Sequence, residues 1–300
     1  QIKFTSIGAS IASFFKLPYI LFMIFKACKK TDHIHIRCPG NIGLLGCFVQ
    51  VWFPKKPKTV KYAGNWDPKS KQPWSYQIQK WILKNEFLTR NTQVLVYGNW
   101  KEPSKNIHPF FTASYKEEEK IDVEPKPLKD KIGLLFVGTL NSGKRPLLSV
   151  QIVKELVNLN HNVHLDIYGE GQQRGTIEAY VSENNLSNFV TLHGNKDKET
   201  LKKAYQKAHF LVFMSKSEGW PKVVAEAMFW KCLPISTNVS CIPEMLNQGK
   251  RGSLIQPKLE AIINEFNFYV NNAKIYKDKV KKAYLWSRTY TLDKFKNEIP

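Results

Sequence analysis

Two glutamates are the residues in this 300-residue chain whose type and spacing best fit a catalytic or ligand-binding role. Glu218 lies in the stretch S-K-S-E-G-W-P-K-V-V-A-E-A-M, which predicts a loop leading from a buried strand into a helix that Pro221 begins. Glu226 then falls about one and a half turns inside that helix. Both carboxylates can reach one cleft, where each can accept hydrogen bonds from sugar or ribose hydroxyls. The spacing alone is common, so the loop-to-helix context carries this prediction.

Glycines and basic residues mark two further loops. The stretch G-T-L-N-S-G-K-R-P starts at Gly138 and places Lys144 and Arg145 before a predicted helix, whose N-terminus favours an anion. It is not a Walker A loop, because Arg145 stands where Ser or Thr is needed. Taken alone it is more typical of a basic surface turn, and the bare G-E-G at Gly169 is more typical of a tight turn without a ligand.

Apolar runs alternate with amphipathic stretches in the second part of the chain. Strands are predicted at residues 132–137, 163–168, 189–193, 210–214 and 233–236, and helices at 145–159, 172–184, 197–207, 221–231 and 242–246. This alternation predicts an α/β fold with a parallel sheet covered on both faces. Ligands of such sheets bind at the carboxyl ends of the strands.

The first part of the chain also shows an α/β pattern, but its predicted strands and helices are less clearly marked. Strands are predicted at residues 34–36, 59–62 and 94–97, and helices at 11–29, 42–53 and 74–87. A complete doubly wound domain usually has more strands, which favours an incomplete first domain.

The chain is strongly basic, and the charge is uneven. Its formal net charge is +20, of which residues 1–116 carry +14 and the rest +6. Such a chain favours anions: nucleic acid, an acidic membrane surface or phosphorylated small molecules. The nine-residue apolar run at 17–25 is too short for a membrane span, which needs about 20 residues. Five cysteines without a C-x-x-C pair indicate free thiols in a reducing compartment rather than disulfides or a zinc site.

The stretch around Glu218 resembles the Glu-x7-Glu signature of the family 4 glycosyltransferases, which have the GT-B fold. The stretches L-L-F-V-G-T-L, D-I-Y-G-E-G and V-T-L-H-G-N and the tail S-R-T-Y-T-L-D-K-F extend the resemblance from about Leu134 to the C-terminus. The signature itself is followed at Ser215, Glu218, Gly219, Trp220, Pro221, Glu226, Ala227, Met228 and Thr237.

The resemblance implies a metal-independent enzyme of the hexosyltransferase type (EC 2.4) that moves a sugar from a nucleotide-diphosphate sugar with retention. It implies that Glu218 is catalytic, lying against the donor sugar, that Glu226 binds the ribose, and that Lys144 binds the diphosphate. Other donor-side residues by resemblance are Arg145, Gly138, Thr139, Gly169, Glu170, Gly194, Asn195, Ser215, Gly219, Trp220 and Lys222. No cofactor and no metal are expected.

Four departures from the family pattern stand out. Thr139 replaces the usual Arg, and Lys231 replaces a Gly in the turn after the signature helix. The Gly-rich loop of the first domain has no match, from which we expect its first strands to be missing. The His of the acceptor cleft also has no counterpart, so Asn65 and Trp66 become the acceptor-side candidates, although Trp66 fits simple packing equally well.

The expected organisation is an incomplete acceptor-side Rossmann-like domain at 1–118 and a linker at 119–131. A donor domain at 132–283 follows, with a C-terminal helix at 284–300 that packs back on the first domain. In the GT-B architecture the two domains face each other across a cleft. The acceptor is expected to be a glycan or a lipid-linked glycan of bacterial surface polysaccharide synthesis. The charge favours a cytoplasmic enzyme held peripherally on the anionic inner face of the membrane.

Three alternatives stay open. A nucleic-acid-binding protein would explain the charge, but the sequence lacks an RNA-recognition aromatic motif, a helix-turn-helix and a zinc finger, and no nucleic acid is expected. Another GT-B enzyme, such as a sugar epimerase, fits the signature less well than a transferase. An inactive GT-B remnant would explain the departures. Release of nucleotide from UDP- or GDP-sugars distinguishes these readings.

Overall fold

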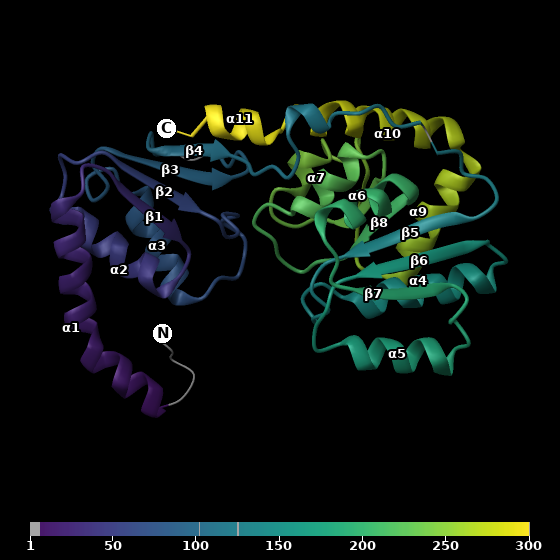
Figure 1. Ribbon diagram of the computed structural model, residues 1–300, viewed down its shortest axis with the longest axis horizontal. Coiled ribbons are helices and arrows are strands. Elements are labelled where there is room, and N and C mark those ends of the chain that lie inside the picture. The colour runs from purple at the N-terminus through teal and green to yellow at the C-terminus, as the bar shows by residue number, and fades with distance from the viewer. Residues whose placement is uncertain (1–6, 102, 125, 300) are drawn as a thin grey trace. The chain divides into compact units, whose positions relative to one another are not determined.

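The chain forms two compact α/β units, each built on a parallel sheet (Figure 1). The computed structural model describes residues 7–101, 103–124 and 126–299. The first unit ends at Phe111, and the second runs from Thr112 to Ile299. Each unit is described by itself.

The first unit has a four-stranded sheet in the order β1-β2-β3-β4, with every neighbouring pair parallel. The first three strands were predicted. The fourth was missed because it is short and contains Pro109, which the edge of a sheet tolerates. The strands are β1 (Ile34–Cys38), β2 (Lys58–Tyr62), β3 (Thr92–Tyr97) and β4 (Ile107–Phe110).

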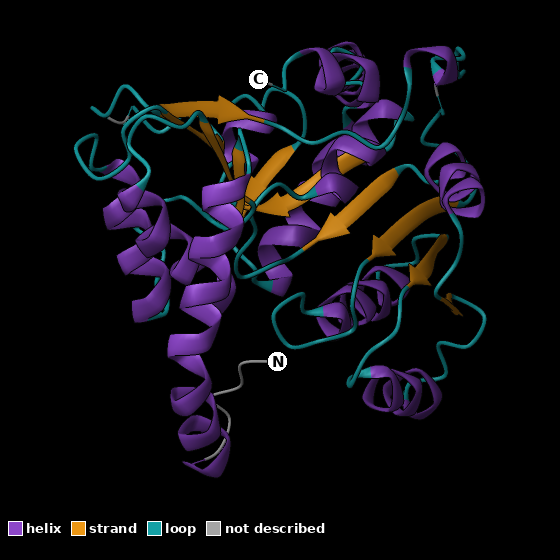
Figure 2. Cartoon of the chain, turned by 60° about the vertical axis from the view of Figure 1, so that its left-hand side comes forward, coloured by secondary structure: helices purple, strands orange, loops and turns teal. Residues whose placement is uncertain are grey.

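Three helices cover one face of this sheet (Figures 1 and 2). They are α1 (Ile7–Lys30), α2 (Asn41–Val49), which continues into the 3-10 turn η1 (Gln50–Trp52), and α3 (Trp74–Lys84). Alternate strand residues such as Ile36, Val60 and Val94 point to that face and form a core with side chains of the helices.

The second unit has a six-stranded parallel sheet in the order β10-β9-β8-β5-β6-β7. Five of the strands were predicted, and only the three-residue edge strand β10 was not. The strand order reverses between β5 and β8, which lie side by side. The strands are β5 (Ile132–Val137), β6 (Val163–Tyr168), β7 (Val190–Gly194), β8 (Phe210–Phe213), β9 (Leu233–Thr237) and β10 (Ser253–Ile255).

Helices cover both faces of the second sheet, with α4 and α5 on one face and α6 and α7 on the other (Figure 1). Asp197 caps the N-terminus of α6, because its carboxylate accepts a hydrogen bond from the Thr200 N–H at 2.8 Å. The helices are α4 (Pro146–Asn158), α5 (Arg174–Glu183), α6 (Lys198–Lys207), α7 (Lys222–Phe229), α8 (Ile242–Met245), α9 (Leu259–Asn271) and α10 (Ala273–Ser287).

The segments expected as a linker and as a C-terminal helix both have structure within the second unit. Residues 112–131 include the 3-10 turn η2 (Glu117–Glu119), and residues 284–299 contain the end of α10, a turn and α11 (Leu292–Asn297). The Leu292 N–H donates to the Tyr115 carbonyl at 2.8 Å. The segment that begins the second unit is therefore in contact with the segment that ends it.

Trp66, an acceptor-side candidate, lies in the core of the first unit. Its side chain has no exposed surface, and its ring meets that of Tyr62 edge-to-face with centroids 4.7 Å apart. A fully buried indole offers no surface to an acceptor, so the packing interpretation holds for this residue.

We predict that Trp66→Ala destabilises the first unit by about 3–5 kcal/mol, because the change removes a large buried ring and leaves a cavity. Trp52→Ala is the matched control in the same unit, since Trp52 is 76% exposed. Its effect should stay within about 0.5 kcal/mol. Urea unfolding followed by hydrogen exchange of the β1–β3 amides measures both. Equal losses for the two variants would contradict the placement of Trp66.

Candidate functional site

The candidate site lies where the strand order of the second sheet reverses. Strands β5 and β8 are neighbours, but the connections that follow them cross to opposite faces of the sheet, with α4 on one face and α7 on the other. Such a reversal leaves a crevice at the carboxyl ends of the two strands. The two loops singled out in the sequence, residues 138–145 and 214–221, follow β5 and β8 and so meet there.

Backbone groups join these two loops directly. The Lys216 N–H donates to the Gly143 carbonyl at 2.8 Å. The Arg145 guanidinium donates to the Met214 carbonyl at 2.9 Å. Arg145 also adopts a left-handed conformation with φ 52°, directly before α4 begins. The Arg145 side chain therefore connects the loop after β5 to the loop after β8.

An ion pair between Lys144 and Glu218 spans the same junction. The side chains are 25% and 10% exposed, so water screens the pair only partly. The Lys144 ammonium also lies 5.0 Å from the ring centre of Phe213, at the end of β8. An ammonium has three donors, and Lys144 can therefore keep Glu218 while it binds an anion.

Glu226 is held by two hydroxyl groups. The Ser114 hydroxyl donates to its Oε1 at 2.5 Å, and the Tyr205 hydroxyl donates to its Oε2 at 2.9 Å. Tyr205 is fully buried, and burial raises its pKa, so the phenol stays protonated and remains a donor. Sequence reasoning missed both partners, because Ser114 is 112 residues away from Glu226 and no local pattern marks either of them.

The G-E-G turn after β6 packs against the loop after β5. A Cβ at Gly169, whose φ is 139°, would lie 1.9 Å from the Gly138 carbonyl oxygen. A Cβ at Gly171 would lie 2.5 Å from the Leu140 carbonyl oxygen, and the Leu140 N–H donates to the Glu170 carbonyl at 2.9 Å. These glycines are thus required by the contact between the loops, which supports the tight-turn interpretation.

The last residue of β7, Gly194, contacts the turn after β6. The Gly169 N–H donates to the Gly194 carbonyl at 2.9 Å, and Gly194 has a left-handed φ of 71°. Asn195 and Thr139 are exposed on their loops. Glu170 makes an ion pair with Arg174, 2.5 Å away.

The remaining predicted residues surround the start of α7. Ser215 is buried, and its hydroxyl donates to the Ser217 carbonyl at 3.2 Å, whereas Lys222 is exposed. The Gly219 carbonyl accepts hydrogen bonds from the Ser240 hydroxyl and the Cys241 thiol, which follow β9. The ring of Trp220 lies 5.8 Å from that of Tyr290.

Two predictions concern residues elsewhere in the chain. Asn65, the other acceptor-side candidate, is buried in the first unit, and its side-chain oxygen accepts a hydrogen bond from the Asp67 N–H at 2.9 Å. That contact belongs to a local turn. Lys231 takes a left-handed conformation with φ 57°, as its place in a turn that usually holds Gly led us to expect.

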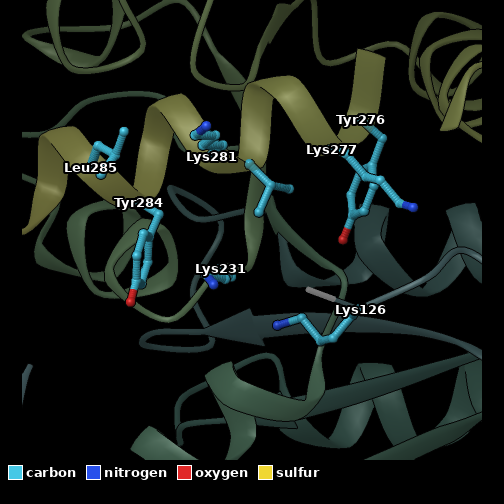
Figure 3. A pocket seen from close by; sticks show the side chains of 8 residues that line it. Lys126, Lys231, Tyr276, Lys277, Lys281, Tyr284 and Leu285 are labelled. Atoms are coloured by element: carbon cyan, nitrogen blue, oxygen red, sulfur yellow. The ribbon is translucent and has the colours of Figure 1, made fainter. Parts of the chain in front are cut away.

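A cavity of about 330 Å³ lies elsewhere in the second unit (Figure 3). Most of its lining comes from α10, including Tyr284 and Leu285, and none of the predicted site residues contributes. The Lys126 ammonium is bound by three backbone carbonyls, each at 3.2 Å, and burial lowers the pKa of this lysine to about 8. This cavity is therefore distinct from the candidate site.

Within the described ranges, no cluster of three or more His, Cys, Asp or Glu side chains could hold a metal ion. The five cysteines are buried and form no disulfide. Charge at the candidate site comes from Lys144, from the carboxylates and from the start of α7.

Comparison with curated proteins gives relatives that act on glycans and peptides. A Campylobacter jejuni protein, named GalNAc-alpha-(1->4)-GalNAc-alpha-(1->3)-diNAcBac-PP-undecaprenol alpha-1,4-N-acetyl-D-galactosaminyltransferase, is 30% identical over 154 residues, covering 47% of this chain and 42% of the relative. The GtfA subunit of a UDP-N-acetylglucosamine–peptide N-acetylglucosaminyltransferase from Limosilactobacillus reuteri is 29% identical over 106 residues, covering 35% of this chain and 20% of the relative. The chain thus spans less than half the length of these relatives.

Solved structures share the fold. HepE of Anabaena, in complex with UDP and glucose, superposes with a TM-score of 0.73 at 10% identity, covering 93% of this chain and 79% of HepE. TarM superposes with a TM-score of 0.66 at 18% identity, covering 94% of this chain and 57% of TarM. These similarities show a GT-B fold. The model of the family described as "Glycosyl transferases group 1" matches residues 116–286, more than half of the chain, and the chain therefore belongs to that family.

Proposed function

We propose that this chain transfers a sugar from a nucleotide-diphosphate sugar to a glycan or lipid-linked acceptor, with retention of configuration at the sugar. The observation that carries the proposal is the meeting of Lys144 and Glu218 at the reversal of the strand order, directly before α7. A cation, a carboxylate and a helix N-terminus at one crevice suit a ligand that joins a diphosphate to a sugar.

The diphosphate is proposed to lie at the start of α7. Pro221 precedes this helix, and no side chain among the described residues caps it. The Val224 N–H donates to the Pro221 carbonyl at 3.0 Å, so the Lys222 and Val223 N–H groups are the ones proposed to bind the anion. Lys144 adds a full positive charge from the opposite loop. Together they stabilise the charge that develops as the nucleoside diphosphate departs, which is a role that a metal ion fills in other enzymes.

The ribose is proposed to bind Glu226. Ser114 and Tyr205 each donate one hydrogen bond to its carboxylate, which has about four acceptor positions. The remaining positions can accept the two ribose hydroxyls. The two donors also fix the carboxylate before a ligand arrives, which reduces the ordering cost of binding.

The transfer breaks the bond between the sugar C1 and the diphosphate oxygen, and the bonding electrons leave with the nucleoside diphosphate. The acceptor oxygen bonds to C1 on the face that the diphosphate leaves, which retains the configuration. Its proton passes to the departing phosphate oxygen. In this mechanism Glu218 orients and polarises the sugar, while the ion pair with Lys144 holds Glu218 in place.

The proposed setting is bacterial surface polysaccharide synthesis on the cytoplasmic face of the membrane. The undecaprenol-linked glycan in the name of the C. jejuni relative supports a lipid-linked acceptor. UDP in the HepE complex supports a nucleotide-linked donor. Incubation of the full chain with UDP- or GDP-sugars should release nucleotide, and release from neither would favour an inactive remnant.

We predict that Glu226→Ala weakens the binding of free UDP or GDP at least several-fold, because the change removes the proposed ribose contact. Titration calorimetry measures the dissociation constant. Glu183→Ala, which removes an exposed carboxylate from α5, is the matched control and should leave affinity unchanged. Unchanged affinity in Glu226→Ala would remove the ribose assignment.

We predict that Lys144→Ala weakens the binding of nucleoside diphosphate by about 1.5–3 kcal/mol, the range for hydrogen bonds to charged groups. Affinity for the nucleoside alone should change little, since that ligand has no phosphate. The exposed Lys203 on α6 provides the control variant Lys203→Ala, which should bind both ligands normally. Equal losses for nucleoside and diphosphate would make Lys144 an ordinary surface charge.

We predict that Tyr205→Phe weakens nucleotide binding by less than Glu226→Ala does, because it removes one of the two donors that position the carboxylate. Tyr276→Phe is the control, since Tyr276 is equally buried and donates at 3.4 Å to the His209 carbonyl. If Tyr205 were only structural, both variants would lower the melting temperature alike and neither would change the nucleotide affinity.

A further inference from the structure

The outer face of α1 carries large apolar side chains that the described residues of the first unit leave exposed. Tyr19, Phe22 and Met23 are 67%, 61% and 46% exposed. Their spacing of three and four residues places them on one side of the helix. Figure 2 shows that the N-terminal half of α1 extends past α2 and α3.

The opposite side of α1 already holds the helix to its unit. Cys28 is buried in the core of the first unit, and Leu21 and Ile24 pack against that core. The Lys56 ammonium donates to the carbonyls of Cys28 and Lys29, each at 2.8 Å, at the C-terminal end of the helix. The exposed face is therefore not needed to attach α1, and its apolar side chains are free to meet a partner.

Lysines flank the exposed apolar face. The helix contains no acidic residue, and four of its lysines are exposed. Helical spacing places all four on the outer side, near the apolar residues. They are Lys16, Lys26, Lys29 and Lys30.

This combination fits one partner better than others. A second copy of the chain would bring the same lysines, within a stretch whose net charge is +14, against a helix that carries no acid to balance them. An anionic bilayer offers both phosphates and an apolar interior. No helix in the described part of the chain is long and apolar enough to cross a bilayer. A helix with an apolar face flanked by lysines is of the kind that lies along the surface of a bilayer.

We infer that α1 lies flat on an anionic lipid bilayer, with Tyr19, Phe22 and Met23 inserted at the boundary of headgroups and acyl chains. The four lysines then lie among the lipid phosphates. Charge alone accounts for an attraction of residues 1–116 to such a surface. The exposed side chains add an apolar contribution that salt does not screen. This inference does not rest on the proposed donor chemistry.

The test is co-sedimentation of the full chain with vesicles of phosphatidylcholine mixed with phosphatidylglycerol. Raising salt from ~0.1 M to ~1 M shortens the Debye length from ~10 Å to ~3 Å. Binding of the unmodified chain should fall but stay measurable at the higher salt. The variant with Tyr19→Ser, Phe22→Ser and Met23→Ser should bind at least tenfold more weakly at both salt concentrations.

A second variant separates the two contributions. Replacing the four lysines by Ser should remove most binding at low salt and leave the high-salt binding at the level of the unmodified chain. The matched control carries Ser at three apolar residues of the second unit that are 52%, 41% and 58% exposed, and it should bind normally. These residues are Leu159, Phe268 and Leu285.

Several results would overturn the inference. Complete loss of binding of the unmodified chain at high salt would show charge attraction without insertion. Normal binding of the Tyr19, Phe22 and Met23 variant, or an equal loss in the control, would place the contact elsewhere. Lipid-free dimers that this variant abolishes, without vesicle binding, would assign the face to a second copy of the chain.

Discussion

The candidate site depends on one constraint, the reversal of strand order between β5 and β8. Because every strand of the second sheet is parallel, the connections on the two sides of this point must leave on opposite faces. The loops that begin those connections therefore meet at one crevice. The backbone bond from Lys216 to Gly143 and the ion pair of Lys144 with Glu218 are consequences of that meeting. Without the reversal, these residues would sit at separate strand ends.

The two carboxylates of the site are held in different ways, and the difference matches the roles proposed for them. Glu218 is held by a cation, so its charge is balanced before a sugar arrives. Glu226 is held by neutral hydroxyl groups of Ser114 and Tyr205, which orient the carboxylate without neutralising it. A group that must accept hydrogen bonds from ribose benefits from keeping its full negative charge.

The sequence predicted the second unit better than the first, for physical reasons. Strand β5 lies inside a doubly covered sheet and is marked by a near-continuous apolar run. Strand β6 is marked by apolar residues that alternate with His164 and Asp166. The edge strand β4 contains Pro109 and gave no such signal. The loops of the site were predicted because glycines and charges stand next to strand ends. The partners of Glu226 were not, because hydrogen bonds between distant segments leave no local pattern. The burial of Trp66 could not be decided for the same reason, since aromatic residues suit both cores and binding surfaces.

The glycines at the carboxyl ends of β5, β6 and β7 limit how this site can change during evolution. Gly138, Gly169 and Gly194 belong to loops that touch through their backbones, and a side chain at Gly169 would collide with its neighbour. Because the backbones are in contact, a substitution at one of these glycines would disturb all three loops. A change in one loop therefore requires compensating changes in the others. Thr139 and Asn195 are exposed on the same loops, so substitutions at these positions disturb the backbone contacts least. The glycine positions of these loops are therefore fixed by backbone contacts, whereas the exposed positions can be substituted at little cost to the fold.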